Sequence, residues 1–222
     1  VQFGDFPLRA GGKSSVYINL RTKNHSRKPG LLDQDDIRKI SSAMQKEVCA
    51  KVLFDAVCGI PQAGIPIARE FWENMPYDIR PPRIHLEECN GEMYIEYISL
   101  LQGHAQQLSH ILFVDDVLTT GSSVREAREA LQRARKGVWK SIQKNFYCSL
   151  LVVVDRDQGA SITLAKEGIE TYSLFTLPNL LDFYYEEGRI IDEEYSSAME
   201  EFRKVHFHSR EMSELVEHGC GD

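Results

Sequence analysis

A chain of 222 residues is long enough for one sizeable domain, or for one domain with a small appendage. Its 42% of hydrophobic residues is ordinary for a globular protein, and no apolar run approaches the roughly 18 residues that a membrane span needs. A net charge of −7 disfavours a general nucleic-acid binder, so we expect neither a membrane nor a nucleic acid as partner.

The N-terminal arm is basic. Residues 1–30 hold six basic residues against one acidic residue, whereas no lysine or arginine lies between residues 84 and 124. Residues 16–20 alternate between apolar and polar side chains, which predicts a strand. Residues 12–14 read Gly-Lys-Ser, as at the end of a P-loop, but Pro7 stands where that motif needs its first glycine, and a strand follows instead of a helix. A P-loop is therefore rejected.

Strands and helices alternate after this arm. Asp33 or Asp35 is expected to cap a helix that runs to about residue 50. The other expected elements, in chain order, are strands or apolar runs at 54–60, 93–101, 111–114, 148–154 and 172–177, and helices at about 64–72, 124–135, 161–168 and 179–205, the last split near Gly188. This alternation predicts an α/β fold with a doubly wound, mostly parallel sheet, whose ligands bind at the carboxyl ends of the strands.

We expect a single domain over residues 1–222. It would consist of a basic arm (1–32), an α/β core with C-terminal helices (33–205) and a polar tail (206–222). The five cysteines form an odd set without CxxC spacing, which is typical of free thiols in a cytoplasmic protein.

The chain is organised around residues 111–124, with the sequence ILFVDDVLTTGSSV. An apolar strand ends at two adjacent carboxylates, Asp115 and Asp116, and a run of hydroxyl residues around Gly121 then opens an amphipathic helix. The free N–H groups and the positive dipole end of a helix N-terminus form an anion site, while two carboxylates fit a ribose diol or a Mg²⁺-bearing phosphate. A sugar phosphate is the simplest ligand. The alternative is that the acidic pair merely ends a strand and caps a helix.

This arrangement resembles the ribose-phosphate signature of type I phosphoribosyltransferases, which bind 5-phosphoribosyl 1-diphosphate (PRPP). Three further segments resemble orotate phosphoribosyltransferases, in particular the transferase domain of uridine monophosphate synthases. These segments are FGDFPLRAGGKSSVYINL (3–20), FDAVCGIPQAGIPIA (54–68) and VDRDQG (154–159). Read alone, the second of them could equally be an ordinary strand-to-helix turn. The resemblance extends over about residues 3 to 205 and implies that the N-terminal arm forms a small hood over the base-binding site.

The resemblance implies a glycosyltransferase-class enzyme of pyrimidine biosynthesis. It would transfer the phosphoribosyl group of PRPP to orotate, giving orotidine 5'-monophosphate and diphosphate. The implied cofactor is Mg²⁺, carried by PRPP near Asp115 and Asp116, and the implied assembly is a homodimer. The residues implied to bind PRPP are Arg9, Gln62, Ala63, Asp115, Asp116, Val117, Leu118, Thr119, Thr120, Gly121, Ser122 and Ser123.

The residues implied to bind orotate are Tyr17, Ile18, Thr119 and Arg156. The planar guanidinium of Arg156 suits a carboxylate because it can bind both oxygens at once. The alternative for this residue is a surface ion pair with Asp155 or Asp157.

One family motif is not matched. Orotate phosphoribosyltransferases carry a mobile basic loop whose lysines and histidine close on the diphosphate, and this chain has no lysine in the corresponding stretch. Arg83 and His85 are the cationic candidates there, beside the acid pair as catalytic residues, whereas Glu87 and Glu88 invert the charge. Two alternatives therefore stay open: a weak or inactive PRPP- or nucleotide-binding homologue that acts as a regulator or partner subunit, and a phosphoribosyltransferase for another base.

Overall fold

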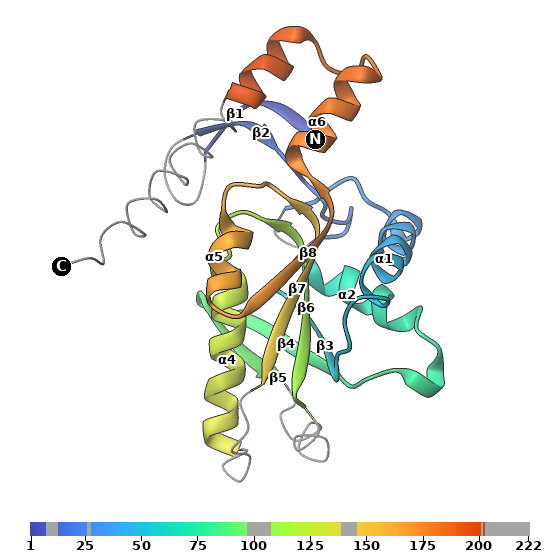
Figure 1. Ribbon diagram of the computed structural model, residues 1–222, viewed down its shortest axis with the longest axis vertical. Helices are drawn as coiled ribbons and strands as arrows, with labels where there is room; N and C mark the ends of the chain where they lie inside the picture. The colour runs from blue at the N-terminus through green and yellow to red at the C-terminus, as the bar shows by residue number, and fades with distance from the viewer. Residues whose placement is uncertain (8–12, 26–27, 97–107, 139–145, 201, 203–222) are drawn as a thin grey trace, which may run out of the picture.

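The computed structural model describes residues 1–7, 13–25, 28–96, 108–138, 146–200 and 202 (Figure 1). The strands, in chain order, are β1 (Gln2–Pro7), β2 (Lys13–Tyr17), β3 (Ala56–Gly59), β4 (Arg83–Cys89), β5 (Glu92–Glu96), β6 (His110–Leu118), β7 (Tyr147–Asp155) and β8 (Ile169–Thr176). The helices are α1 (Gln34–Val48), α2 (Gly64–Glu73), the 3-10 helix η1 (Tyr77–Ile79), α4 (Ser122–Val138), α5 (Ala160–Lys166) and α6 (Leu177–Glu186), followed by helical residues 192–200.

The core is a six-stranded sheet in the order β5-β4-β3-β6-β7-β8. Strands β4, β3, β6, β7 and β8 are parallel to their neighbours, and only β5 pairs antiparallel, with β4. Helices α4 and α5 cover one face of the sheet and α1 and α2 cover the other (Figure 1). The predicted α/β fold with a doubly wound, mostly parallel sheet is confirmed.

Local sequence explains the best-defined elements. Every residue of β7 except the first is buried, as expected for an apolar strand between two helical layers. Helix α1 begins with a capping box, in which the Asp33 carboxylate accepts from the backbone N–H of Asp36 at 3.0 Å and the Asp36 carboxylate accepts from that of Asp33 at 3.0 Å. The predicted cap at Asp33 is therefore confirmed.

The N-terminal arm forms a separate two-stranded antiparallel sheet of β1 and β2. The strand predicted at 16–20 is shifted: β2 begins at Lys13, which pairs with Pro7, and ends at Tyr17, so residues 18–20 lie outside it. Alternation of apolar and polar residues marks which side chains are buried and not where a ladder of hydrogen bonds begins or ends. Figure 1 shows this hairpin beside α6 at the end of the molecule toward which β8 runs, which is the carboxyl edge of the parallel sheet.

The stretch aligned with the basic loop of the resemblance is a β-hairpin. Strand β4 pairs parallel with β3 and antiparallel with β5, and a turn at Asn90 (φ 53°) and Gly91 (φ 81°) joins β4 to β5. Asn-Gly is a frequent hairpin turn because both residues tolerate positive φ. Arg83 and His85, the cationic candidates in the stretch that corresponds to the family's mobile loop, therefore lie on a strand of the main sheet. Residues 97–101 of the predicted apolar run lie outside the described residues.

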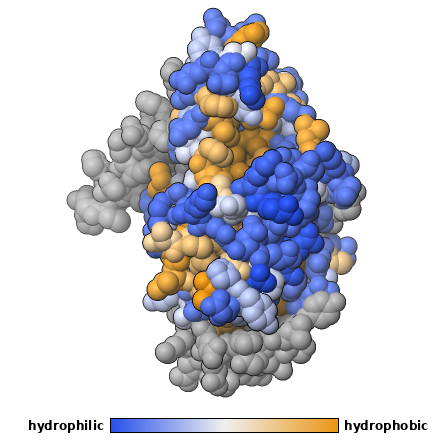
Figure 2. Space-filling model, turned by 90° about the vertical axis from the view of Figure 1, so that its right-hand side faces the viewer, coloured by the Kyte–Doolittle hydropathy of each residue, from blue (hydrophilic) through white to orange (hydrophobic). Residues whose placement is uncertain are grey.

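Seen from the side of α1 and α2, the surface is mostly hydrophilic, with apolar residues gathered mainly in its upper half (Figure 2). Within the described residues, no helix is both long and apolar enough to cross a membrane. Cys49, Cys58, Cys89 and Cys148 are free thiols, and burial raises the pKa of Cys148 to about 12. Cys220 and the rest of the tail at 206–222 lie outside the described residues.

Candidate active site

The acid pair lies near the carboxyl end of β6 and near the centre of the sheet. The strand was predicted to end at Val114, but it continues through both carboxylates to Leu118, because backbone pairing with β7 extends that far. Asp115 and Asp116 are half-buried, and each side chain accepts a backbone N–H bond at 2.8 Å from the residue that follows it. Burial raises the pKa of both carboxyl groups, and the charge of Asp116 raises that of Asp115 further, whereas Arg21 lowers both. The pair is therefore held in a site that favours a ligand able to offset its charge, such as a hydroxyl-rich or metal-bearing one.

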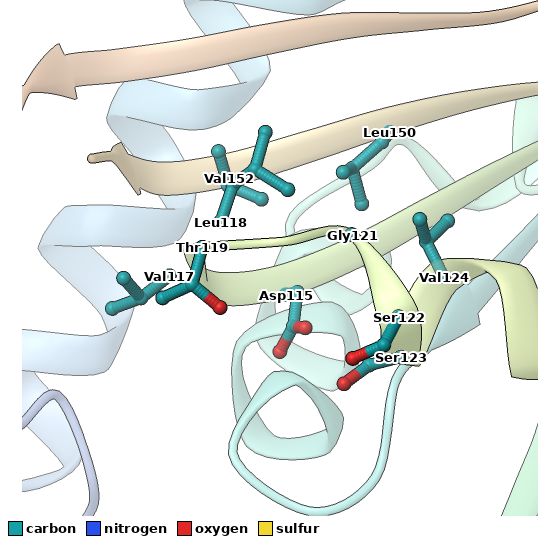
Figure 3. A pocket seen from close by; sticks show the side chains of 10 residues that line it. All are labelled: Asp115, Val117, Leu118, Thr119, Gly121, Ser122, Ser123, Val124, Leu150 and Val152. Carbon is teal, nitrogen blue, oxygen red and sulfur yellow. The ribbon is translucent and has the colours of Figure 1, made fainter. Parts of the chain in front are cut away.

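A pocket of about 250 Å³, part of it open to solvent, adjoins the pair. Figure 3 shows the carboxylate of Asp115 and the hydroxyls of Ser122 and Ser123 facing the same space. The residues that line this pocket are Asp115, Val117, Leu118, Thr119, Gly121, Ser122, Ser123, Val124, Leu150 and Val152. Seven of the residues predicted to bind PRPP are thus brought together here, and α4 begins at its edge.

The turn between β6 and α4 requires a glycine. Gly121 has φ +75°, a conformation that residues with a side chain rarely adopt, and a Cβ there would approach the Leu164 side chain to 3.1 Å. The turn leaves the first N–H groups of the 17-residue helix α4 without partners within the helix. We name residues 119–122 the phosphate loop, because N–H groups and hydroxyls gathered at a helix N-terminus suit an anion.

A second turn, at residues 61–64, presses against the acid pair. A Cβ on Gly64 would lie 2.3 Å from the backbone oxygen of Val114 and 2.9 Å from the Cα of Asp115, so only glycine fits. The Pro61–Gln62 peptide bond is cis. Gln62 is half-buried and Ala63 is buried, so both predicted contacts of the diphosphate lie beside the end of β6.

Arg156 joins the N-terminal arm to the end of β7. Its side chain is only 6% exposed, and its Nη2 donates to Oγ of the buried Ser14 at 2.8 Å. This contact with a residue 142 positions away in the chain is a structural alternative to the predicted role in binding a carboxylate. Because it brings the arm to the carboxyl edge of the sheet, the arm covers the side of the site where the base is expected.

Tyr17 and Ile18 lie in this covering arm. The Tyr17 ring stacks on Phe6 with centroids 5.3 Å apart, and Ile18 is buried. The hydroxyl of Tyr17 accepts from Nη1 of Arg21 at 2.7 Å. Arg9, the cation that the resemblance implies for PRPP, lies outside the described residues.

Arg21 is a site residue that the sequence analysis missed. Its charge acts on both carboxylates of the acid pair, as the pKa of each shows. Its backbone is held by Gly30, at which a Cβ would lie 1.9 Å from the carbonyl oxygen of Arg21. The concentration of positive charge in the first 30 residues was the available signal, but it does not distinguish Arg21 from the other five cations of the arm.

The acid pair fits a metal that arrives with its ligand. Among the described residues, no three His, Cys, Asp or Glu side chains gather as a metal site. Two carboxylates nevertheless supply oxygen ligands of the kind that Mg²⁺ prefers, and Mg²⁺ commonly takes its remaining ligands from substrate phosphates and water. A Mg²⁺ bound here would therefore depend on a phosphate-bearing ligand.

Comparison with known proteins agrees with this geometry, although no family model matches the chain. An orotate phosphoribosyltransferase of Caenorhabditis elegans is 31% identical over 180 residues, which cover 81% of this chain and 70% of that protein. The chain belongs to the orotate phosphoribosyltransferase family. A uridine 5'-monophosphate synthase of the same organism is 29% identical over 90% of this chain, which spans only 36% of that longer protein.

Solved structures share the fold of this family member. A UMP synthase of Leishmania donovani superposes with a TM-score of 0.67 at 24% identity, covering 91% of this chain and 39% of that protein. An orotate phosphoribosyltransferase of Aeropyrum pernix superposes with a TM-score of 0.58 at 24% identity, covering 83% of this chain and 92% of that protein. The α/β core and the position of its carboxyl edge are therefore those of the family.

On β4, Arg83 and His85 are held by neighbouring side chains. The Nε of Arg83 donates to Nε2 of His85 at 3.3 Å, and the Arg83 guanidinium lies over the Trp72 ring at 5.4 Å. Burial, and then the charge of Arg83, lower the pKa of His85, so its imidazole is neutral at pH 7. Arg83 thus contacts His85 and the Trp72 ring of α2, and the catalytic role predicted for Arg83 and His85 stays a prediction.

Proposed function

We propose that this chain transfers the 5-phosphoribosyl group of PRPP to orotate, giving orotidine 5'-monophosphate and diphosphate. The observation that carries the proposal is the acid pair between two turns at helix N-termini, a geometry that fits a ribose with an anionic group at each end. The relatives named as orotate phosphoribosyltransferases and UMP synthases support an enzyme over a non-catalytic homologue.

In this proposal each part of PRPP has its own contacts. Residues 119–123 bind the 5-phosphate through backbone N–H groups and hydroxyls, and Gln62 and Ala63 contact the diphosphate. Asp115 and Asp116 bind the ribose hydroxyls and Mg²⁺. Arg156 binds the carboxylate of orotate under the cover of Tyr17 and Ile18.

Catalysis would rest on positioning and electrostatics. Positive charge develops on the ribose ring as diphosphate leaves, and the acid pair lies where the ring would sit, so its charge stabilises that transition state. Mg²⁺ would supply charge neutralisation for the departing diphosphate. Binding orotate and the sugar next to each other in a reactive orientation lowers the barrier further, because the entropy cost of bringing the two together is met by binding.

The proposal extends to a two-fold homodimer, which is the commonest closed symmetry, and to the cytoplasm, with which the free thiols are compatible. Light scattering at micromolar concentration tests the assembly, and a monomer would contradict it.

The deciding experiment measures diphosphate release from PRPP and Mg²⁺ with purified protein, with and without orotate. We expect release that requires orotate. Release that is equal with another pyrimidine or purine base would instead identify a transferase for that base. A melting curve adds a second readout: PRPP at a hundredfold excess over its dissociation constant should stabilise the fold by about 2.7 kcal/mol. No shift at millimolar PRPP would contradict the site assignment.

A further inference from the structure

The phosphate loop has few strong bonds of its own. Thr119, Thr120 and Ser122 are exposed, and the contacts within the loop are long: Oγ1 of Thr120 lies 3.3 Å from Oγ of Ser122 and 3.4 Å from its backbone nitrogen. Hydrogen bonds of this length are weak. A loop whose N–H groups must all point at one phosphate therefore needs a support from outside.

Arg125, in the first turn of α4, supplies that support. Its Nη1 donates to the backbone oxygen of Thr120 at 2.8 Å. Its other nitrogens reach α5 and the residue that follows it, with Nε bonded to the Glu167 carboxylate at 2.8 Å and Nη2 to Oγ1 of Thr163 at 3.3 Å. All three nitrogens of the guanidinium are thus used, in the forked geometry that only arginine offers.

This contact bears on the ligand because a peptide group is planar. In a trans peptide, the N–H of residue 121 points away from the carbonyl of Thr120, so fixing that carbonyl also fixes the direction of the Gly121 N–H. Gly121 lines the pocket, whereas Arg125 does not. Arg125 therefore binds the carbonyl oxygen of the loop, and the N–H group of Gly121 stays available to bind a phosphate.

The same side chain connects two parts of the proposed site. Helix α5 begins directly after residues 155–159, the segment that carries Arg156, and its Leu164 packs against Gly121. Arg125 thus fastens the phosphate loop to the helix that follows the segment at the base site.

We propose that Arg125 is a positioning residue that holds the phosphate loop in its anion-binding form and thereby sets the affinity for the 5-phosphate of the ribose. This inference rests on the proposed function of the same site. It assigns Arg125 no contact with substrate.

The chain offers a matched control in Arg128. Its Nη2 bonds the Glu167 carboxylate at 3.3 Å and its Nη1 bonds the Glu167 backbone oxygen at 2.9 Å. Arg125 and Arg128 thus have the same charge, share one carboxylate and have side chains 31% and 26% exposed. They differ in their other contacts. Arg125 bonds the backbone oxygen of Thr120 and Oγ1 of Thr163, whereas Arg128 bonds the backbone oxygen of Glu167 and has no bond to the phosphate loop.

The experiment compares Arg125→Gln, Arg125→Lys and Arg128→Gln with wild type, using ribose 5-phosphate and Mg²⁺-diphosphate as separate probes in binding titrations and PRPP in steady-state kinetics. For Arg125→Gln we expect about a 10-fold loss of ribose 5-phosphate affinity and a similar rise in KM for PRPP, the size of one charge-assisted hydrogen bond. Diphosphate affinity and kcat should stay within about twofold. Arg128→Gln should match wild type within about twofold for every probe.

Arg125→Lys separates geometry from charge. A lysine keeps the charge but cannot bond Thr120, Thr163 and Glu167 together, so we expect a loss of several-fold for ribose 5-phosphate. Arg125→Lys also provides a second variant for the same measurements if Arg125→Gln does not fold. Wild-type affinity in Arg125→Lys, equal losses in the Arg125 and Arg128 variants, or an equal loss for diphosphate would each overturn the inference. A wild-type protein that binds neither PRPP nor ribose 5-phosphate would overturn the proposed function itself.

Discussion

The phosphate loop follows β6 and the turn of the β4–β5 hairpin follows β4, so both come after the carboxyl ends of parallel strands, but the two regions differ in the charge that they carry. The loop carries no charged side chain and presents backbone N–H groups and hydroxyls. The hairpin carries Glu87 and Glu88 in the stretch that the resemblance pairs with a basic loop, and Glu92 and Glu96 on β5.

The difference shows which kind of anion site tolerates sequence change. A site made of backbone donors depends on a turn and a glycine, so it persists as long as the turn does. A site made of basic side chains on a loop is lost when those residues are replaced. In this chain we therefore expect binding of the ribose phosphate to be retained and stabilisation of the leaving diphosphate to be weakened.

The largest expected effect is at the acid pair, which lies between these two regions. Asp116→Asn should lower kcat for orotidine monophosphate formation by about 10²–10³, because a charge aimed at the transition state is removed. The melting temperature should not fall, since burial already raises the pKa of this carboxyl group. An active Asp116→Asn protein would show that the pair does not act on the reacting sugar.

The acidic side chains of the hairpin lead us to expect a low turnover number for the wild-type enzyme. We expect a turnover at least about a hundredfold below the enzyme median of roughly 10 s⁻¹, because Glu87 and Glu88 would repel a departing diphosphate. The double variant Glu87→Lys, Glu88→Lys should raise kcat with little change in PRPP affinity. The double variant Glu126→Lys, Glu129→Lys at exposed positions of α4 makes the same change in net charge and serves as the control. A wild-type turnover of several per second would contradict this prediction and point to a cation of the N-terminal arm, such as Lys13, Arg21 or Lys23.

A substitution at Arg156, on the side of the site where orotate is expected, should have a smaller effect that is confined mainly to orotate. Arg156→Lys should weaken orotate use by about 1.5–3 kcal/mol, or roughly 10- to 100-fold, because one ammonium cannot bind both carboxylate oxygens. Binding of PRPP alone should change much less. Ser14→Ala, which removes the bond of Arg156 to the arm, is the control for a structural role. Equal losses of orotate and PRPP would mean that Arg156 mainly supports the fold.

The smallest expected effect is on the stability of the ligand-free protein as pH changes. Because the folded-state pKa values of Asp115 and Asp116 are raised, the folded protein holds more protons than the unfolded chain above pH 3.8, and stability falls as pH rises from there through the folded pKa values. Each pKa unit corresponds to about 1.4 kcal/mol. Asp116→Asn should therefore melt higher relative to wild type at pH 7.5 than at pH 4. A constant difference between the two melting temperatures would contradict this.

Much of the fold could be read from local patterns. The apolar runs of β6 and β7, the cap at Asp33 and the helix after Gly121 depend on residues close in sequence, and all four were predicted. Of the hairpin at residues 83–96, the second strand falls within the run expected at 93–101, whereas the first strand was not predicted although it has local signals of its own. These were the alternation of buried Ile84 and Leu86 and the Asn-Gly turn.

The sequence by itself indicated most of the strands and helices of the core and the residue types at the carboxyl edge, because periodicity, caps and glycine turns act over a few residues. Only the tertiary structure decided which distant groups meet. The charge of Arg21 acts on the acid pair, Ser14 bonds Arg156, and Arg125 connects the phosphate loop to α5. These contacts depend on how strands register and helices pack across the whole sheet, and no local pattern encodes that information.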